Sequence, residues 1–141
     1  MINIYEAKTE DEIANCFSVF KALRPHLTVE NFVPQVKRQQ AQGYKILALS
    51  DNGIVQSIIG YRQSEFLAWG EIIYIDDLST AEEVRGKGYA GKLLDQIINK
   101  AKSLGLQGVH LDTGYARHFA HRLYLNKGLN FSSHHLSITF S

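Results

Sequence analysis

The middle of the chain holds three apolar runs that are typical of β-strands, at 44–50, 54–61 and 71–80. The first two runs are separated only by residues 51–53, which read Asp-Asn-Gly. An Asn-Gly pair between two apolar runs is a strong signal for a tight β-hairpin. A second turn around residues 68–70 leads into the third run. We therefore predict three consecutive antiparallel strands.

The segment before these strands predicts one short strand and two helices. Residues 2–7 alternate between apolar and polar side chains, as a half-buried strand does. Thr9 is a suitable N-cap for a helix that stops at Arg24, which precedes a proline. A second helix is predicted at about 29–42, and the alternative is a start close to Pro34, with the proline in the first turn.

The segment after the strands alternates helix and strand. We predict helices at 88–103 and 116–126, and strands at 108–112 and 131–140. The element order is then β-α-α-β-β-β-α-β-α-β in a single domain, 1–141. This order indicates an α/β fold (α+β) with a mixed sheet, because a strand–helix–strand crossover places the strands 71–80 and 108–112 parallel and adjacent.

Composition excludes several classes of protein. The 141 residues are enough for one domain, and 45% hydrophobic with 21% charged residues is ordinary for a globular protein. Fifteen basic and fourteen acidic residues give a net charge of +1, so we expect no nucleic-acid and no membrane partner. The single cysteine, Cys16, excludes an intramolecular disulfide and a multi-cysteine zinc site. We expect a soluble, cytoplasmic protein.

The turn between residues 85 and 92, Arg-Gly-Lys-Gly-Tyr-Ala-Gly-Lys, carries the clearest chemical signal. It connects a strand to a helix N-terminus, where glycines let backbone N–H groups converge on one point and the helix end adds partial positive charge. Residues 84–102 contain five basic side chains and one acidic side chain. The turn therefore predicts a pyrophosphate site. The alternative interpretation is that the glycines only allow tight packing at the start of the helix.

Physical reasoning alone leaves the kind of pyrophosphate open. Gly86, Gly88 and Gly91 have the spacing of the dinucleotide-binding turn. However, no acidic ribose ligand follows about 20 residues later, and the preceding strands are antiparallel. A nucleotide-binding α/β protein therefore stays as a rival interpretation.

Two blocks of the sequence resemble a known family. Arg85-x-x-Gly88-x-Ala90 resembles the acetyl-coenzyme A signature R/Q-x-x-G-x-G/A of the GNAT superfamily of N-acetyltransferases. Downstream, Ala120-x-x-x-Tyr124 followed by Lys-Gly and an aromatic residue resembles the second family block, N-x-x-A-x-x-x-Y-x-x-x-G-F. The resemblance covers nearly the whole chain and implies a GNAT-like acyl-CoA N-acyltransferase fold.

The chain departs from the family pattern at two places. Arg117 stands where the family has an asparagine that contacts the pantetheine arm, and an arginine there would instead meet a phosphate or a substrate carboxylate. The family's Gly-Phe pair is spread over 128–131. With acetyl-CoA as co-substrate, the resemblance implies a set of cofactor-binding positions: Leu78, Thr80, Arg85, Gly86, Lys87, Gly88, Tyr89, Ala90 and Arg117.

The resemblance also implies catalytic residues. Tyr124 occupies the position of a tyrosine that faces the coenzyme sulfur and protonates the leaving thiolate, although its position between two leucines also suits packing. Asp76 and Asp77 are candidates for the base that deprotonates the amine, directly or through water, or for electrostatic attraction of a cationic amine. Adjacent carboxylates point to opposite faces of a strand unless a bulge intervenes. The i, i+3 pair His118 and His121 is a weak metal signal, and we expect no metal.

The sequence therefore predicts an N-acetyltransferase that moves an acetyl group from acetyl-CoA to a primary amine by direct attack in a ternary complex. The alternative is a CoA-binding regulatory module without catalytic activity. The acceptor class stays open between a small-molecule amine and a protein amine, and a homodimer is one assembly that the sequence allows.

Overall fold

The computed structural model describes residues 1–113, 118–133 and 135–140. The chain divides into two compact units, residues 1–111 and 112–141, and each is described by itself. The first unit contains, in chain order, β1 (Ile2–Glu6), α1 (Glu10–Ala14), α2 (Phe17–Leu23), α3 (Val29–Gln40), β2 (Tyr44–Asp51), β3 (Ile54–Phe66), β4 (Gly70–Thr80), the 3-10 turn η1 (Glu82–Val84), α4 (Tyr89–Ser103) and β5 (Gly108–Leu111). The second unit contains α5 (His118–Asn126).

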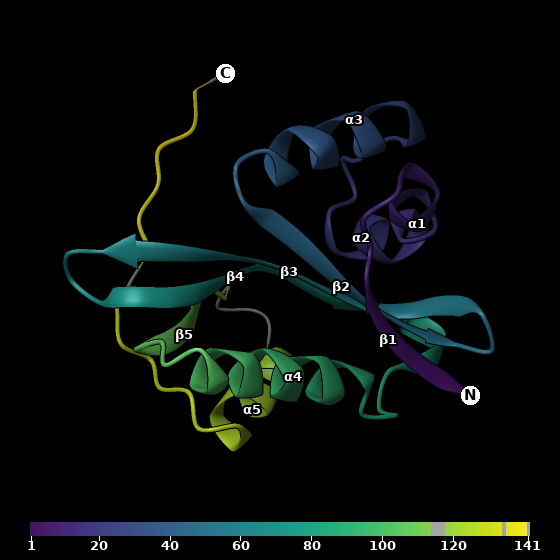
Figure 1. Ribbon diagram of the computed structural model, residues 1–141. Coiled ribbons are helices and arrows are strands. Elements are labelled where there is room, and N and C mark those ends of the chain that lie inside the picture. The colour runs from purple at the N-terminus through teal and green to yellow at the C-terminus, as the bar shows by residue number, and fades with distance from the viewer. Residues whose placement is uncertain (114–117, 134, 141) are drawn as a thin grey trace. The chain divides into compact units, whose positions relative to one another are not determined.

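The sheet of the first unit is mixed, as predicted. Its five strands lie in the order β1-β2-β3-β4-β5, with antiparallel pairing throughout except between β4 and β5, which are parallel (Figure 1). The hairpin between β2 and β3 turns through Asn52 and Gly53, which have φ angles of 52° and 82°. These left-handed conformations are those that a two-residue hairpin turn requires.

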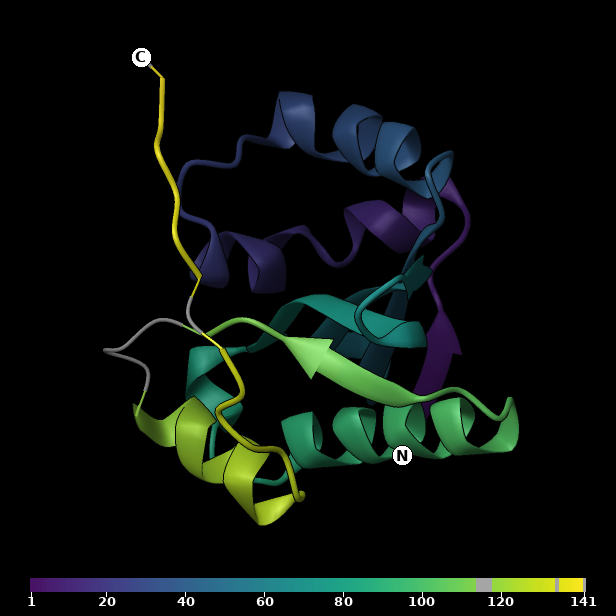
Figure 2. The same cartoon turned by 90° about the vertical axis from the view of Figure 1, so that its left-hand side faces the viewer.

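Helices cover both faces of this sheet. The helices α1, α2 and α3 lie on one face and α4 lies on the other (Figures 1 and 2). The apolar stripe of α4 is buried, as its spacing predicts. The core between the sheet and the first three helices consists of Ala7, Ile13, Cys16, Val19, Phe20, Phe32, Val36, Tyr44, Ile46, Ala48, Val55 and Ile58.

The prediction of a single first helix is wrong, because the chain turns more tightly between α1 and α2. The backbone N–H of Cys16 donates to the carbonyl of Ile13, three residues back, at 3.0 Å, instead of to the carbonyl four residues back. The Cys16 thiol lies in the core, and burial raises its pKa to about 12. The thiol is therefore an uncharged packing group at neutral pH.

The predicted start of the next helix is confirmed, because α3 begins at Val29, and the alternative of a start close to Pro34 is wrong, because the proline lies in the helix interior. The Thr28 side chain accepts a hydrogen bond from the Asn31 backbone N–H, and the Phe32 N–H donates to the Thr28 carbonyl. This cap completes the first turn upstream of the proline, so the helix does not need Pro34 as its first residue.

In the second unit, the prediction of a terminal strand at 131–140 is wrong for the residues that the structure describes. Residues 131–133 and 135–140 form no strand, and the apolar side chains of Leu136, Ile138 and Phe140 are exposed. Alternating apolar residues make a strand only when a neighbouring strand takes up the backbone hydrogen bonds. Over the described part of the chain, no helix is long and apolar enough to cross a membrane.

Candidate active site

A β-bulge near the end of β4 organises the site. On β3, Gly60 pairs with Asp77 and Tyr61 pairs with Ile75, so Asp76 is an extra residue without a partner. Ile75 is also the last residue of β4 that pairs with β5. Residues 76–80 therefore continue β4 beyond its pairing with β5, and this stretch of the strand's edge begins at the bulge.

The bulge brings both predicted carboxylates to the same face of the sheet. The Tyr44 hydroxyl donates to Asp77 Oδ2 at 2.6 Å, and Arg62 donates from Nε and Nη2 to Asp76, with the shortest contact at 2.6 Å. Tyr44 and Arg62 are directly paired across β2 and β3, so their side chains lie on one face. Without the bulge, Asp76 and Asp77 would lie on opposite faces.

A second arginine completes this group. Arg24, at the end of α2, donates from Nε to Asp77 Oδ1 at 3.1 Å, and its Nη2 lies 3.0 Å from the same oxygen. The same Nη2 also donates to the backbone carbonyl of Asp76 at 3.0 Å. We refer to Arg24, Tyr44, Arg62, Asp76 and Asp77 as the bulge cluster.

Room for the Tyr44 hydroxyl in the bulge cluster comes from a glycine. A Cβ atom at Gly60 would overlap that hydroxyl, so no other residue fits at this position without displacing Tyr44. Gly60 is the residue that pairs with Asp77 across the bulge. The close approach therefore lets the tyrosine reach the carboxylate.

Burial and the two arginines set the protonation of the bulge cluster. Burial raises the pKa of Asp76, and the hydrogen bonds from Arg62 act in the opposite direction. Burial and the neighbouring Asp77 raise the pKa of Tyr44 well above its usual value, so the hydroxyl stays protonated and donates. Each carboxylate is thus engaged by an arginine, and the predicted role of one of them as general base stays a prediction.

The glycine turn has the geometry of an anion site. Gly86 and Gly88 have φ angles of 89° and 83°, which residues with a Cβ atom rarely adopt. Gly88 is the N-cap of α4 and provides no side-chain acceptor. The backbone N–H groups of the first turn of α4 have no intrahelical acceptor, and the helix dipole favours a negative charge beside them.

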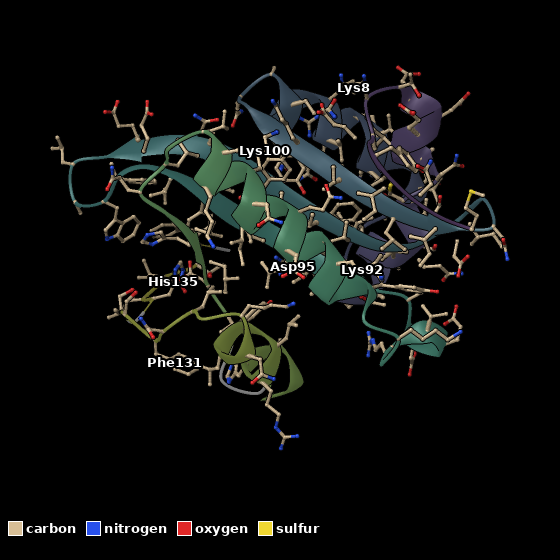
Figure 3. All side chains as sticks on the ribbon, turned by 60° about the horizontal axis from the view of Figure 1, so that its bottom comes forward. Lys8, Lys92, Asp95, Lys100, Phe131 and His135 are labelled. Atoms are coloured by element: carbon tan, nitrogen blue, oxygen red, sulfur yellow. The ribbon has the colours of Figure 1, made fainter. Side chains whose placement is uncertain are left out.

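The side chains of the turn have different roles. The Tyr89 ring is buried, and its hydroxyl donates to Asp51 Oδ2 at 2.7 Å, so only its backbone is available to a phosphate. Arg85 is exposed and donates from Nε to the Thr80 carbonyl at 3.3 Å. Lys87 is exposed, and so is Lys92, which lies near the N-terminal end of α4 (Figure 3).

These positions lead to a prediction about the exposed charges. We expect Lys87→Ala and Arg85→Ala each to weaken acetyl-CoA binding by about 2- to 5-fold at low salt, because exposed ion pairs contribute up to about 1 kcal/mol. The effect should shrink as added salt screens the charges. Calorimetric titration at two salt concentrations checks this, with Lys45→Ala, an exposed lysine on β2, as the control. An effect that does not change with salt would contradict an electrostatic role.

In the second unit, Tyr124 lies on α5 and is 6% exposed. Its backbone carbonyl accepts from the N–H groups of Lys127 and Leu129, which flank Gly128 just past the end of α5. Tyr124's predicted role as an acid stays a prediction. Arg117 lies outside the described residues.

The histidine pair His118 and His121 is only partly covered by the structure, so the expectation of no metal site stays a prediction. Among the described residues, no group of three or more His, Cys, Asp or Glu side chains could hold a metal ion. The side chain of His118, one half of the predicted histidine pair, lies outside what the structure describes.

Sequence reasoning missed the partners of the two carboxylates. The sequence pattern marks Arg24 as the end of a helix and Tyr44 as a strand residue, and it ends the predicted strand 54–61 one residue before Arg62, whereas β3 extends to Phe66. The hairpin turn gives a partial signal for the pairing of Tyr44 and Arg62. Counting residues outward from the turn pairs Tyr44 with Tyr61, which is one residue short of Arg62. A bulge between Leu49 and Ser50 shifts this register by one residue and makes Arg62 the partner.

Comparison with known proteins decides the family. The family model "Acetyltransferase (GNAT) family" matches residues 7–131. The chain belongs to the GNAT acetyltransferase family. A GNAT relative, described as an uncharacterized N-acetyltransferase YhdJ from Bacillus subtilis (strain 168), is 30% identical over 128 residues, which are 90% of each chain.

Solved structures share the fold at low sequence identity. An aminoglycoside N-acetyltransferase in complex with CoA matches with a TM-score of 0.84 and 10% identity, over 99% of this GNAT chain and 95% of its own. A ribosomal-protein-alanine N-acetyltransferase from Brucella melitensis biovar Abortus 2308 matches with a TM-score of 0.84 and 14% identity, over all of both chains. The mixed sheet with helices on both faces is therefore the GNAT fold, as the resemblance predicts.

Proposed function

We propose that this protein is an acetyl-CoA-dependent N-acetyltransferase that moves the acetyl group to a primary amine by direct attack in a ternary complex. The proposal rests on one observation in the first unit: the edge of β4 that is not paired with β5 leads directly into the glycine turn. The edge of β4 beyond its pairing with β5 ends at Thr80, and the chain passes through η1 directly into the glycine turn. A ligand with a pyrophosphate and an extended amide-bearing arm matches both features.

The two features fit the two halves of coenzyme A. The pyrophosphate would accept hydrogen bonds from backbone N–H groups between Gly86 and Ala90, with α4 supplying partial positive charge. The pantetheine arm carries amide groups, and it would pair with backbone groups of Leu78 and Thr80 as an added strand does. An arm that starts at the turn and follows β4 backwards brings its thioester end to the bulge.

The chemistry needs an unprotonated amine, a polarised carbonyl and a stabilised leaving group. The amine nitrogen attacks the thioester carbon, the C–S bond breaks, and the sulfur leaves as a thiolate that takes up a proton. Tyr124 is proposed as the donor of that proton. The acceptor would be a small-molecule or protein amine that reaches the thioester from the side of the bulge cluster.

The test is acetyl-CoA binding followed by product formation. We expect calorimetry to show one site for acetyl-CoA, and a panel of amines to stimulate release of the CoA thiol with matching acetylated product by mass spectrometry. Binding without amine-dependent thiol release would favour the CoA-binding regulatory module. Binding of a nucleotide in place of acetyl-CoA would contradict the proposal and favour the nucleotide-binding interpretation.

A further inference from the structure

We infer that the acceptor amine of this enzyme belongs to the weakly basic α-amino class, which is partly unprotonated at neutral pH, and not to the class of lysine side chains and polyamines. The inference rests on the proposed function, because it concerns the substrate of that same site. The balance of charge in the bulge cluster carries it.

The first step is the pairing inside the bulge cluster. Asp76 is engaged by two nitrogens of Arg62, and Asp77 by Arg24 and by the Tyr44 hydroxyl. Two carboxylates face two guanidinium groups, and the protonated tyrosine adds no charge. Neither carboxylate is left over to form an ion pair with an incoming ammonium group.

The second step concerns the segment that follows α2. Lys21, one turn before Arg24, donates from Nζ to the carbonyls of Pro25 and Leu27 at 2.6 and 2.7 Å. This lysine adds a positive charge to the segment that carries Arg24. The other charged groups of β3 and β4, Glu65 and Glu71, are register partners next to the β3–β4 turn, about 16 Å along β4 from Asp76. The bulge cluster itself is therefore neutral, and no net negative charge in it attracts a cationic acceptor.

The third step is the balance of protons. A neutral amine that attacks the thioester becomes an amide by losing one proton, and the departing thiolate takes up one proton to become the CoA thiol. This exchange is balanced without any further base. An ammonium acceptor must first lose an additional proton, and in the bulge cluster both carboxylates that could accept it are already hydrogen-bonded to arginines.

The magnitude of the effect follows from ordinary pKa values. An α-amino group has a pKa of about 7.7–8.0, so roughly a third of it is neutral at pH 7.5. A lysine amine has a pKa of about 10.4, so only about 0.1% of it is neutral at that pH. At pH 7.5 the neutral form that can attack the thioester is therefore roughly 10²-fold more abundant for the α-amine than for the lysine amine.

The experiment compares two amide-bearing acceptors, glycylglycine amide, with a free α-amine, and Nα-acetyl-lysine amide, with a free side-chain amine. Acetylated product is measured from pH 6.5 to 9.5. We expect kcat/KM at pH 7.5 to be at least tenfold higher for the α-amine, whose pH profile should level off above its own pKa of about 8. The profile of the lysine derivative should still rise about tenfold per pH unit up to pH 9.5, because its pKa of about 10.4 lies above the measured range. An inflection that is identical for both acceptors, or a preference for the lysine derivative, would overturn the inference.

Matched variants test the role of the bulge cluster. Arg62→Gln releases Asp76, and we expect it to raise the activity on the lysine derivative relative to the α-amine several-fold. Arg38→Gln removes the same charge from an exposed position on α3 and should leave the ratio unchanged. In Asp76→Asn, the inflection of the pH profile should still follow the pKa of the acceptor. If the unaltered enzyme shows an inflection at a fixed pH for both acceptors, and Asp76→Asn loses it, Asp76 is the base and the inference is overturned.

Failure of the proposed function has a different signature from failure of the inference. Efficient acetylation of the lysine derivative, with no preference for the α-amine, overturns the acceptor class and leaves an active N-acetyltransferase. Bound acetyl-CoA without acetylated product from either amine at any pH overturns the proposed function and the acceptor class together. Circular dichroism of Arg62→Gln and Asp76→Asn confirms that the variants compared are folded.

Discussion

Replacement of Gly88 by glutamate is expected to raise the Kd for acetyl-CoA by at least about 100-fold. The new carboxylate would stand at the N-terminus of α4, where the proposed pyrophosphate accepts backbone hydrogen bonds. Like charges about 4 Å apart near a protein surface repel by roughly 4 kcal/mol, which exceeds the approximately 2.7 kcal/mol that a 100-fold change requires. Calorimetric titration with acetyl-CoA measures the change.

The control for Gly88→Glu must reproduce the backbone strain without the phosphate site. Gly105, just past the C-terminal end of α4, has a φ of 71°, and a Cβ there meets nothing within 4 Å, as at Gly88. Gly105→Glu therefore adds the same side chain in the same kind of conformation at the other end of the helix. We expect it to cost stability but not affinity, and equal affinity loss in both variants would contradict a pyrophosphate site at Gly88.

The fold of the first unit was largely predictable because its signals are local. The Asn-Gly turn specifies the β2–β3 hairpin, and the apolar spacing of α4 specifies its buried face. The crossover between β4 and β5 then leaves only the parallel arrangement. The break at Cys16 was not predictable, because both halves of the segment keep helical spacing and only the backbone hydrogen bond to Ile13 shows the tighter turn.

The site was predictable only in part because two bulges decide which side chains meet. The bulge in β2–β3 replaces Tyr61 by Arg62 as the partner of Tyr44, and the bulge at Asp76 turns both carboxylates to one face. A bulge inserts one residue into a ladder, and this changes every later pairing and face. The apolar pattern around a bulge contains no reliable mark of it, so a count from the turn gives the wrong neighbour.

Replacement of Tyr124 by phenylalanine is expected to lower kcat by one to three orders of magnitude while the affinity for acetyl-CoA stays nearly constant. A tyrosine with a pKa of about 10 is a suitable proton donor to a thiolate whose conjugate acid has a pKa near 8.5. General acid catalysis of this kind contributes typically about 10²–10⁴-fold. The ring and its packing are kept, so the free energy of unfolding should fall by only about 1 kcal/mol.

The control for Tyr124→Phe removes the hydroxyl of another buried tyrosine. Tyr61 is 3% exposed, and its hydroxyl accepts a hydrogen bond from Lys100 Nζ at 3.1 Å, so Tyr61→Phe also deletes one buried hydroxyl. We expect Tyr61→Phe to keep kcat within a few-fold of the unaltered enzyme, which separates loss of a proton donor from a general loss of stability. A Tyr124→Phe protein that stays folded and turns over a weakly basic amine at the unaltered rate would exclude the acid role. Parallel loss of kcat and thermal stability in that variant would instead assign Tyr124 to packing, because a missing proton donor slows thiol release without lowering the melting temperature.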